Sequence, residues 1–148
     1  MTALTANFAI DWHCRHTWRR ASKNTAWCLL GCAIGDFGTI AFFQFTGIPW
    51  PTMAIMVLAI VNGLLTSIAL ETFILSRQMD LRTAFRTAIG MSFTSMISME
   101  AMMNAVDWAL TGGAVLTWWV VPIMLAAGFV TPLPYNYWRL KALGKACH

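Results

Sequence analysis

Four long apolar runs constrain this chain more than any other feature of its sequence. They cover residues 25–45, 52–75, 87–110 and 114–131, and each approaches or exceeds the ~20 residues that cross a bilayer as a helix. Only 11% of the residues are charged, whereas soluble domains carry about 25%, so the apolar excess must face lipid. The sequence therefore predicts an all-α integral membrane protein, a four-helix bundle that forms one domain.

The distribution of Lys and Arg predicts the orientation of these spans. All ten basic residues lie before the first run, between the second and third, or after the fourth. The two loops of the other side contain none, so the positive-inside rule places the N-terminus and the C-terminus both in the cytoplasm. We expect residues 1–24 to form a basic cytoplasmic segment, residues 25–131 the transmembrane bundle, and residues 132–148 a cytoplasmic tail. Because the basic residues form no contiguous face, the net charge of +4 does not indicate nucleic-acid binding.

Carboxylates lie inside the predicted spans, among them Asp36, Glu71 and Glu100. No Lys or Arg within a span can neutralise them, and a charged side chain in the hydrocarbon region is costly. Each carboxyl group is therefore either protonated or balanced by a bound cation. For a single residue, a protonated acid hydrogen-bonded between helices would be an adequate explanation. Three such residues without a basic partner predict an intramembrane proton or cation site.

Polar and sulfur-containing residues share one face of each of the first three predicted helices, at about 100° per residue. These residues are Cys28, Cys32, Gly35, Asp36 and Thr39 in the first helix, Met53, Met56, Ser67 and Glu71 in the second, and Ser92, Met96, Met99, Glu100, Met103, Asn104 and Asp107 in the third. Lipid would penalise these faces, so we expect them to meet in the interior, with Asp36 and Glu100 at similar depth. Gly31 and Gly35 should allow a close helix approach.

Thiol, imidazole and thioether side chains indicate soft-metal chemistry. All the Cys and His residues fall on the predicted cytoplasmic side or in the inner half of the first span, where a reducing environment favours free thiols over disulfides. Five of the ten methionines lie between Met91 and Met103, and thioether sulfur suits Cu(I), although methionine also packs readily in apolar cores. The predicted metal ligands are His13, Cys14, His16, Cys28, Cys32, Asp36, Met96, Met99, Glu100, Met103, Cys147 and His148.

These residues predict a small membrane protein that transports, senses or delivers a soft metal ion, with Cu(I) favoured. Zn(II) stays open because carboxylates suit it better than they suit Cu(I). A noncatalytic assembly or scaffold subunit of a larger membrane complex is the main alternative. A membrane thiol oxidoreductase is a weaker one, because Cys28-x-x-x-Cys32 lacks the Cys-x-x-Cys spacing. No nucleotide loop, nucleophile elbow or zinc-protease motif occurs, so we expect no enzyme activity.

Three segments carry a family resemblance: residues 27–36, residues 91–100 and the closing residues 132–148. Together they resemble an uncharacterised family of small bacterial four-span membrane proteins, known only as domain of unknown function 4396. The resemblance covers nearly the whole chain. It implies the fold and a multi-pass location in the bacterial inner membrane, but no activity and no site residues. The lipid bilayer is the expected partner, and a metal chaperone, another membrane protein or a second copy of the chain stays open.

Overall fold

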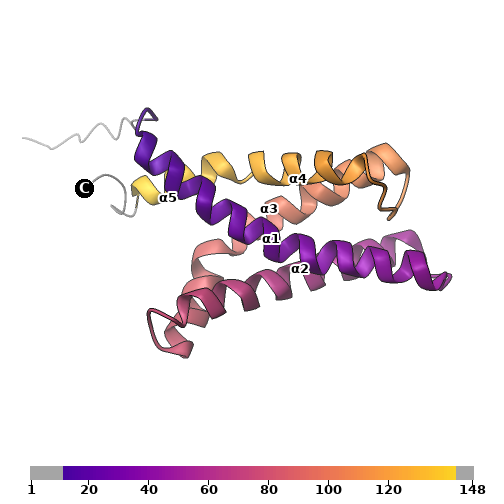
Figure 1. Ribbon diagram of the computed structural model, residues 1–148, viewed down its shortest axis with the longest axis horizontal. Helices are drawn as coiled ribbons and strands as arrows, with labels where there is room; N and C mark the ends of the chain where they lie inside the picture. Colours follow the sequence, from indigo (N-terminus) through magenta and orange to yellow (C-terminus); the bar gives the residue numbers. More distant parts are fainter. Residues whose placement is uncertain (1–11, 143–148) are drawn as a thin grey trace, which may run out of the picture.

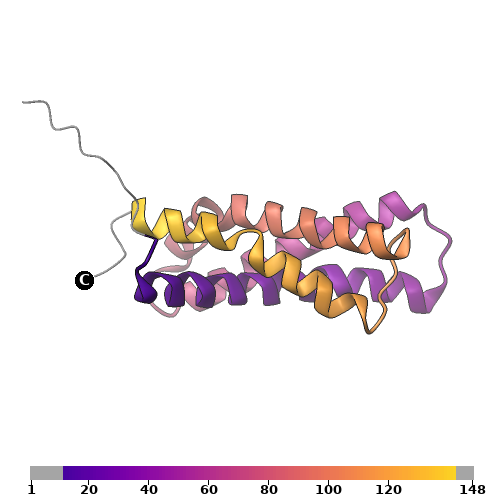
Figure 2. The same ribbon diagram turned by 90° about the horizontal axis from the view of Figure 1, so that it is seen from above.

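The computed structural model describes residues 12–142, which form five α-helices and no strand in that range, so the all-α prediction is confirmed. The helices are α1 (Arg15–Thr46), α2 (Thr52–Leu75), α3 (Leu81–Thr111), α4 (Val120–Val130) and α5 (Leu133–Ala142). They run along the long axis of the molecule, with α4 and α5 following each other end to end (Figures 1 and 2). The start of α1 and the end of α5 lie at the same end.

From α1 to α4, helices that follow each other in sequence pack side by side. The most extensive packing joins α1 to α2, followed by α2 with α3 and α3 with α4, while α5 returns against α1. Gly47 (φ 63°) and Gly112 (φ 77°) end α1 and α3 in the left-handed conformation, which glycine adopts without strain. At the start of α3, the Thr83 N–H donates a 3.0 Å hydrogen bond to the Asp80 carboxylate, which caps the helix.

The close packing of α1 on α2 depends on two glycines. A Cβ atom at Gly31 would collide with the backbone of Ser67, and one at Gly35 would collide with the backbone of Asn62. The space left by the missing side chains lets Thr66 donate a 2.6 Å hydrogen bond to the Gly31 carbonyl oxygen. The predicted close approach at these glycines is confirmed.

The helix bounds differ from the predicted runs, except at α2, whose bounds agree. α1 and α3 begin earlier, at Arg15 and Leu81, because hydropathy finds only the apolar part of a helix that continues into polar residues. α4 begins late, at Val120, so Pro122 lies in its first turn, where a missing N–H is tolerated, instead of kinking a longer helix. Residues 133–142, expected as a tail, form α5.

A small apolar cluster holds α5 against the start of α1. Tyr137 and Leu140 lie one turn apart on α5 and are buried against Ala21, with Trp18 packed beside them. The ring centroids of Trp12 and Tyr137 are 5.1 Å apart and stacked. The side-chain amide of Asn136 adds a 2.8 Å hydrogen bond to the Thr25 hydroxyl. These contacts explain why a segment without an apolar run still forms a docked helix.

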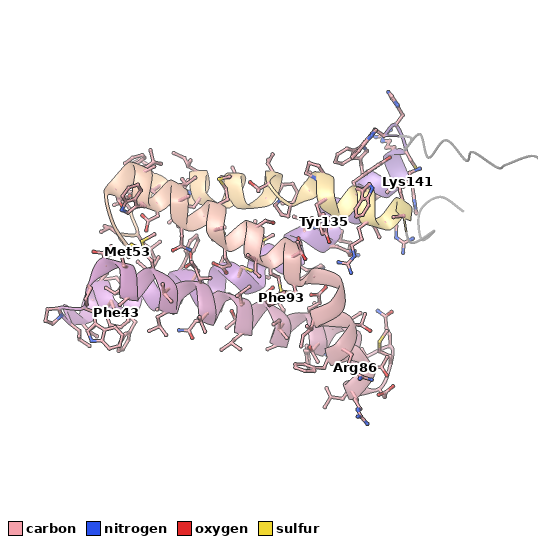
Figure 3. All side chains as sticks on the ribbon, turned by 180° about the vertical axis from the view of Figure 1, so that it is seen from behind. Phe43, Met53, Arg86, Phe93, Tyr135 and Lys141 are labelled. Atoms are coloured by element: carbon pink, nitrogen blue, oxygen red, sulfur yellow. The ribbon has the colours of Figure 1, made fainter. Side chains whose placement is uncertain are left out.

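Apolar side chains cover much of the outer surface, and the interior contains buried polar residues. Two helices, α1 and α2, are long and apolar enough to cross a membrane. Large exposed side chains occur on every helix, for example Phe45 (86%), Met53 (66%), Phe93 (45%) and Trp138 (44%). The prediction that Met53 faces inward is therefore wrong. Figure 3 shows Arg86 and Lys141 at one end of the molecule and Phe43 and Met53 at the other.

Candidate functional site

Cys28, Cys32 and Asp36 follow one another by single turns along the inner face of α1. Their exposed fractions are 6%, 0% and 0%, because Gly31 and Gly35 draw this side of α1 against α2. Both thiols are free, and they interact with each other. The Cys28 sulfur also lies 3.5 Å from the Ser67 hydroxyl of α2. The predicted inward face of this helix is confirmed.

The two cysteines belong to a larger buried cluster of sulfur-containing side chains, which we call the sulfur core. Its members are Cys28 and Cys32 of α1, Met96, Met99 and Met103 of α3, and Met124 of α4, packed together with Val120. All four methionines are fully buried. Gly128, one turn after Met124, makes room for the core, because a Cβ atom there would collide with the Met103 side chain.

Met124 was missed in the sequence analysis. It lies in an apolar run, where a methionine carries no signal unless the packing of α4 on α3 is known. Met96, Met99 and Met103 were predicted correctly as members of the inward face of α3.

Glu100 lies beside the sulfur core and carries a carboxyl group in an unusual setting. Its side chain is fully buried, the Cys32 thiol lies next to it, and neither oxygen accepts a well-formed hydrogen bond from the described residues. Gly63 of α2 provides the space, since a Cβ atom at that position would overlap Oε1. The carboxyl group therefore occupies a notch at Gly63, from which a Cβ atom would displace it.

Asp36 and Glu100 meet in the interior, as predicted. The side-chain amide of Asn104 donates one 3.1 Å hydrogen bond to Asp36 Oδ1 and another to the Glu100 carbonyl oxygen. Asp36 Oδ2 is buried and has no hydrogen-bond partner among residues 12–142. The cysteines, Glu100 and Asp36 thus form a continuous series of thiol and carboxyl groups between α1 and α3.

Asp107 has a structural role instead. Its carboxylate accepts a 2.9 Å hydrogen bond from the Thr111 hydroxyl and a 3.2 Å hydrogen bond from the Val115 N–H. Because these bonds hold the loop between α3 and α4 in place, this buried acid is accounted for without a ligand.

Glu71 lies closer to the basic end than Glu100 does, beside the Cys28 end of the thiol and carboxyl series. The Ser92 hydroxyl donates a 2.6 Å hydrogen bond to its Oε1, while Oε2 is buried without a partner in the described part of the chain. Glu71 lines a cavity of about 60 Å³ that also touches Cys28. Of the acids predicted as one set, Asp36 and Glu100 thus lie together, and Glu71 lies on the far side of Cys28 from them.

The predicted ligands near the start of α1 are not part of the sulfur core. Cys14 is disulfide-bonded, so the prediction of free thiols is wrong at this residue. His13 and His16 lie in the exposed segment at the start of α1. Cys147 and His148 lie outside the described residues. Within residues 12–142, no group of three or more His, Cys, Asp or Glu side chains is placed to hold a metal ion, so a metal in the core would need thioether ligands.

Comparison with known proteins gives a family and no function. A family model described as a domain of unknown function (DUF4396) matches residues 17–145. Neither the curated proteins nor the solved structures contain a match to the chain.

Proposed function

The chain belongs to the DUF4396 family of domains of unknown function, and we propose that it is a four-span membrane protein that binds and passes Cu(I) through its sulfur core. The observation that carries this proposal is the burial of two free thiols and four thioethers in one cluster. Thiolate and thioether sulfur are the ligands that select Cu(I) among common metal ions. The alternative is plain packing, which methionine also serves.

The arrangement of apolar and polar side chains supports the membrane part of the proposal. The exterior exposes Leu, Ile, Phe and Trp side chains on every helix, while carboxyl, amide and hydroxyl groups lie inside. Such a distribution suits lipid, which penalises exposed polar groups. In the proposed arrangement α1, α2 and α3 are three of the spans, and α4 with α5 forms the fourth.

The positions of the charges support the orientation. Every Lys and Arg within residues 12–142 belongs to the first part of α1, to the α2–α3 connection and the start of α3, or to α5. These segments lie at one end of the molecule (Figures 1 and 3). That end would be cytoplasmic by the positive-inside rule.

Glu100 would assist the metal by passing a proton out of the core. A thiol must lose its proton to become a thiolate ligand, so binding of Cu(I) at Cys32 releases a proton. The Glu100 carboxyl group lies next to that thiol, with both oxygens unoccupied by well-formed hydrogen bonds in the described structure. Without a cation the buried Glu100 would carry its own proton, so it would take the thiol proton on one oxygen as it releases its own from the other. One proton would then leave the core for each Cu(I) that a thiolate binds, and the charge of the thiolate would be balanced by the metal.

A Cu(I) titration of the purified full-length protein tests the proposal. The wild type and the Cys28→Ser/Cys32→Ser variant are titrated against a competing Cu(I) chelator, and circular dichroism checks that both retain their helices. Because Ser nearly preserves the volume of Cys, the variant should keep its fold and lose the tight site. Equal stoichiometry and affinity in the two proteins would remove the case for the core.

The outcome also separates the alternatives. A folded wild type that takes up no Cu(I) would favour the assembly-subunit function. A thiol oxidoreductase is disfavoured by the burial of Cys28 and Cys32, because catalytic thiols need access to their substrate.

A further inference from the structure

A polar cavity lies between the basic end of the molecule and the sulfur core. Its volume is about 60 Å³, several times the ~15 Å³ that one water molecule requires. Four helices contribute to its wall: α1, α2, α3 and α5. Cys28, at one edge of the sulfur core, is part of the same wall, so the cavity adjoins the core directly.

Two oxygen atoms at this cavity are buried and have no hydrogen-bond partner among the described residues. They are Oε2 of Glu71 and Oγ of Ser95, whose side chain is only 2% exposed. The other carboxyl oxygen of Glu71 is fixed by the 2.6 Å hydrogen bond from Ser92. Buried polar atoms nearly always have a partner, so these two atoms indicate that something occupies the cavity.

Arg139 is the other charged residue of the cavity wall. Its guanidinium group donates a 2.8 Å hydrogen bond to the Gly90 carbonyl oxygen, at an exposed position. This bond joins α5 to α3 at the rim, whereas the unpartnered oxygen of Glu71 is buried. From the rim Arg139 also acts electrostatically on the Glu71 carboxyl group. The unpartnered oxygen atoms and the Cys28 side chain lie on the buried side of the cavity, which suits a cation more than an anion.

We propose that this cavity is a binding site for a hydrated monovalent cation, with Glu71 Oε2 and Ser95 Oγ as its ligands. The two oxygens would replace part of the water shell, and Cys28 would be the next ligand inward. Under the proposed function, on which the identity of the physiological ion rests, the cavity is where Cu(I) enters before it reaches the sulfur core. Binding of other monovalent cations does not depend on that function.

Equilibrium dialysis with Tl(I) tests the site, since Tl(I) is a monovalent ion that oxygen ligands bind without redox chemistry. The full-length Cys28→Ser/Cys32→Ser protein is used as the background, so that thiols do not contribute. In this background Glu71→Gln should weaken binding at least about tenfold, because it removes the charge nearest the ion. Ser95→Ala should also weaken it, and Arg139→Gln should strengthen it by removing a positive charge from the rim.

Asp80→Asn is the matched control. It makes the same chemical change at an exposed carboxylate on the same end of the molecule, and asparagine still caps a helix. It should leave Tl(I) binding unchanged. No binding to the background protein, or binding that survives both Glu71→Gln and Ser95→Ala, overturns the cavity site. If Tl(I) binds through Glu71 while the wild type takes up no Cu(I), the site stands and the proposed function falls.

Discussion

The side-chain amide of Asn104 donates a 3.1 Å hydrogen bond to Oδ1 of Asp36, across the interface between α3 and α1. Both side chains are almost fully buried. A bond between two buried polar groups fixes the relative position of their helices, because a slip would leave the Asp36 carboxyl group without its donor.

Replacing Asn104 by Ala should therefore reduce stability by about 1–3 kcal/mol, since Asp36 Oδ1 loses its donor in the interior. Asn62→Ala is the control, because its 2.8 Å hydrogen bond to Thr39 is only part-buried. That change should cost less, about 0.5–1.5 kcal/mol. Denaturant titration in mixed micelles measures both, and equal losses would contradict the special role of the Asp36 contact.

Substitutions of the methionines in the sulfur core should lower the affinity for Cu(I) and change the folding stability little. Leu has a similar volume to Met, so Met99→Leu should change stability by less than about 1.5 kcal/mol. The same change removes one thioether, and Cu(I) affinity should fall. Met102→Leu, at a neighbouring residue that is 37% exposed, should leave the affinity unchanged. Competition with a Cu(I) chelator provides the comparison, and indistinguishable affinities for the two variants would argue for packing alone.

The notch under Glu100 predicts a contrast between two glycines. Gly63→Ala places a methyl group where the Glu100 carboxyl group lies and should destabilise the protein by about 1–3 kcal/mol. Gly38→Ala meets no atom within 4 Å and should be neutral or stabilising by up to about 1 kcal/mol, because alanine favours helix. Glu100→Ala should restore stability to the Gly63→Ala variant. Failure of that rescue would show that the clash lies elsewhere.

The Asp80 cap of α3 should make the stability of the protein fall at low pH. Hydrogen bonds from the side chain and the backbone N–H of Thr83 hold the pKa of Asp80 below its ordinary value. The stabilisation is therefore present above the ordinary pKa of about 3.9 and is lost as the pH falls through the lower, folded-state value. Asp80→Asn removes this titration and keeps a capping group. Unfolding measured from neutral pH to about pH 3 should show a smaller acid loss in the variant; parallel curves would count against the cap.

Reporter fusions test the orientation. A reporter fused at residue 1 or at residue 148 should be cytoplasmic, and one inserted between residues 47 and 51 should be external. The reason is that the basic residues lie in the segments near the chain termini and between α2 and α3, whereas the loop at 47–51 has none. An external C-terminus would exclude the four-span arrangement, whereas it would leave the packing of α1, α2 and α3 unaffected.

Hydropathy predicted the positions of the helices better than their ends. The apolar run of α2 coincides with its helix, but α1 extends back to Arg15 through charged residues that hydropathy excludes. Residues 114–119 are as apolar as a span and yet are not helical, because the Val115 N–H bonds to the Asp107 side chain. α5 is held in place by the contact of Tyr137 with α1. A contact between parts of the chain that are distant in sequence gives no periodic pattern of apolar residues, so α5 could not be predicted from the sequence.

The candidate site was predicted where a single helix carries the pattern. Cys28, Cys32 and Asp36 on α1, and Met96, Met99, Glu100 and Met103 on α3, follow from helical spacing, and all are buried. Met124, Ser95 and Arg139 were not found, because each gains its place only when two helices pack together.

The Glu100 carboxyl group fills the space that a side chain at position 63 would need, so the residues at the two positions should vary together in evolution. A side chain at position 63 requires either a shorter residue at position 100 or a shift of the Glu100 carboxyl group, so the buried acid keeps its present place only beside a glycine. Substitutions at these positions should therefore occur in pairs among relatives. Glycine at 63 would mark the members that retain the acid beside the sulfur core, and alanine or serine there would mark the members that have lost it.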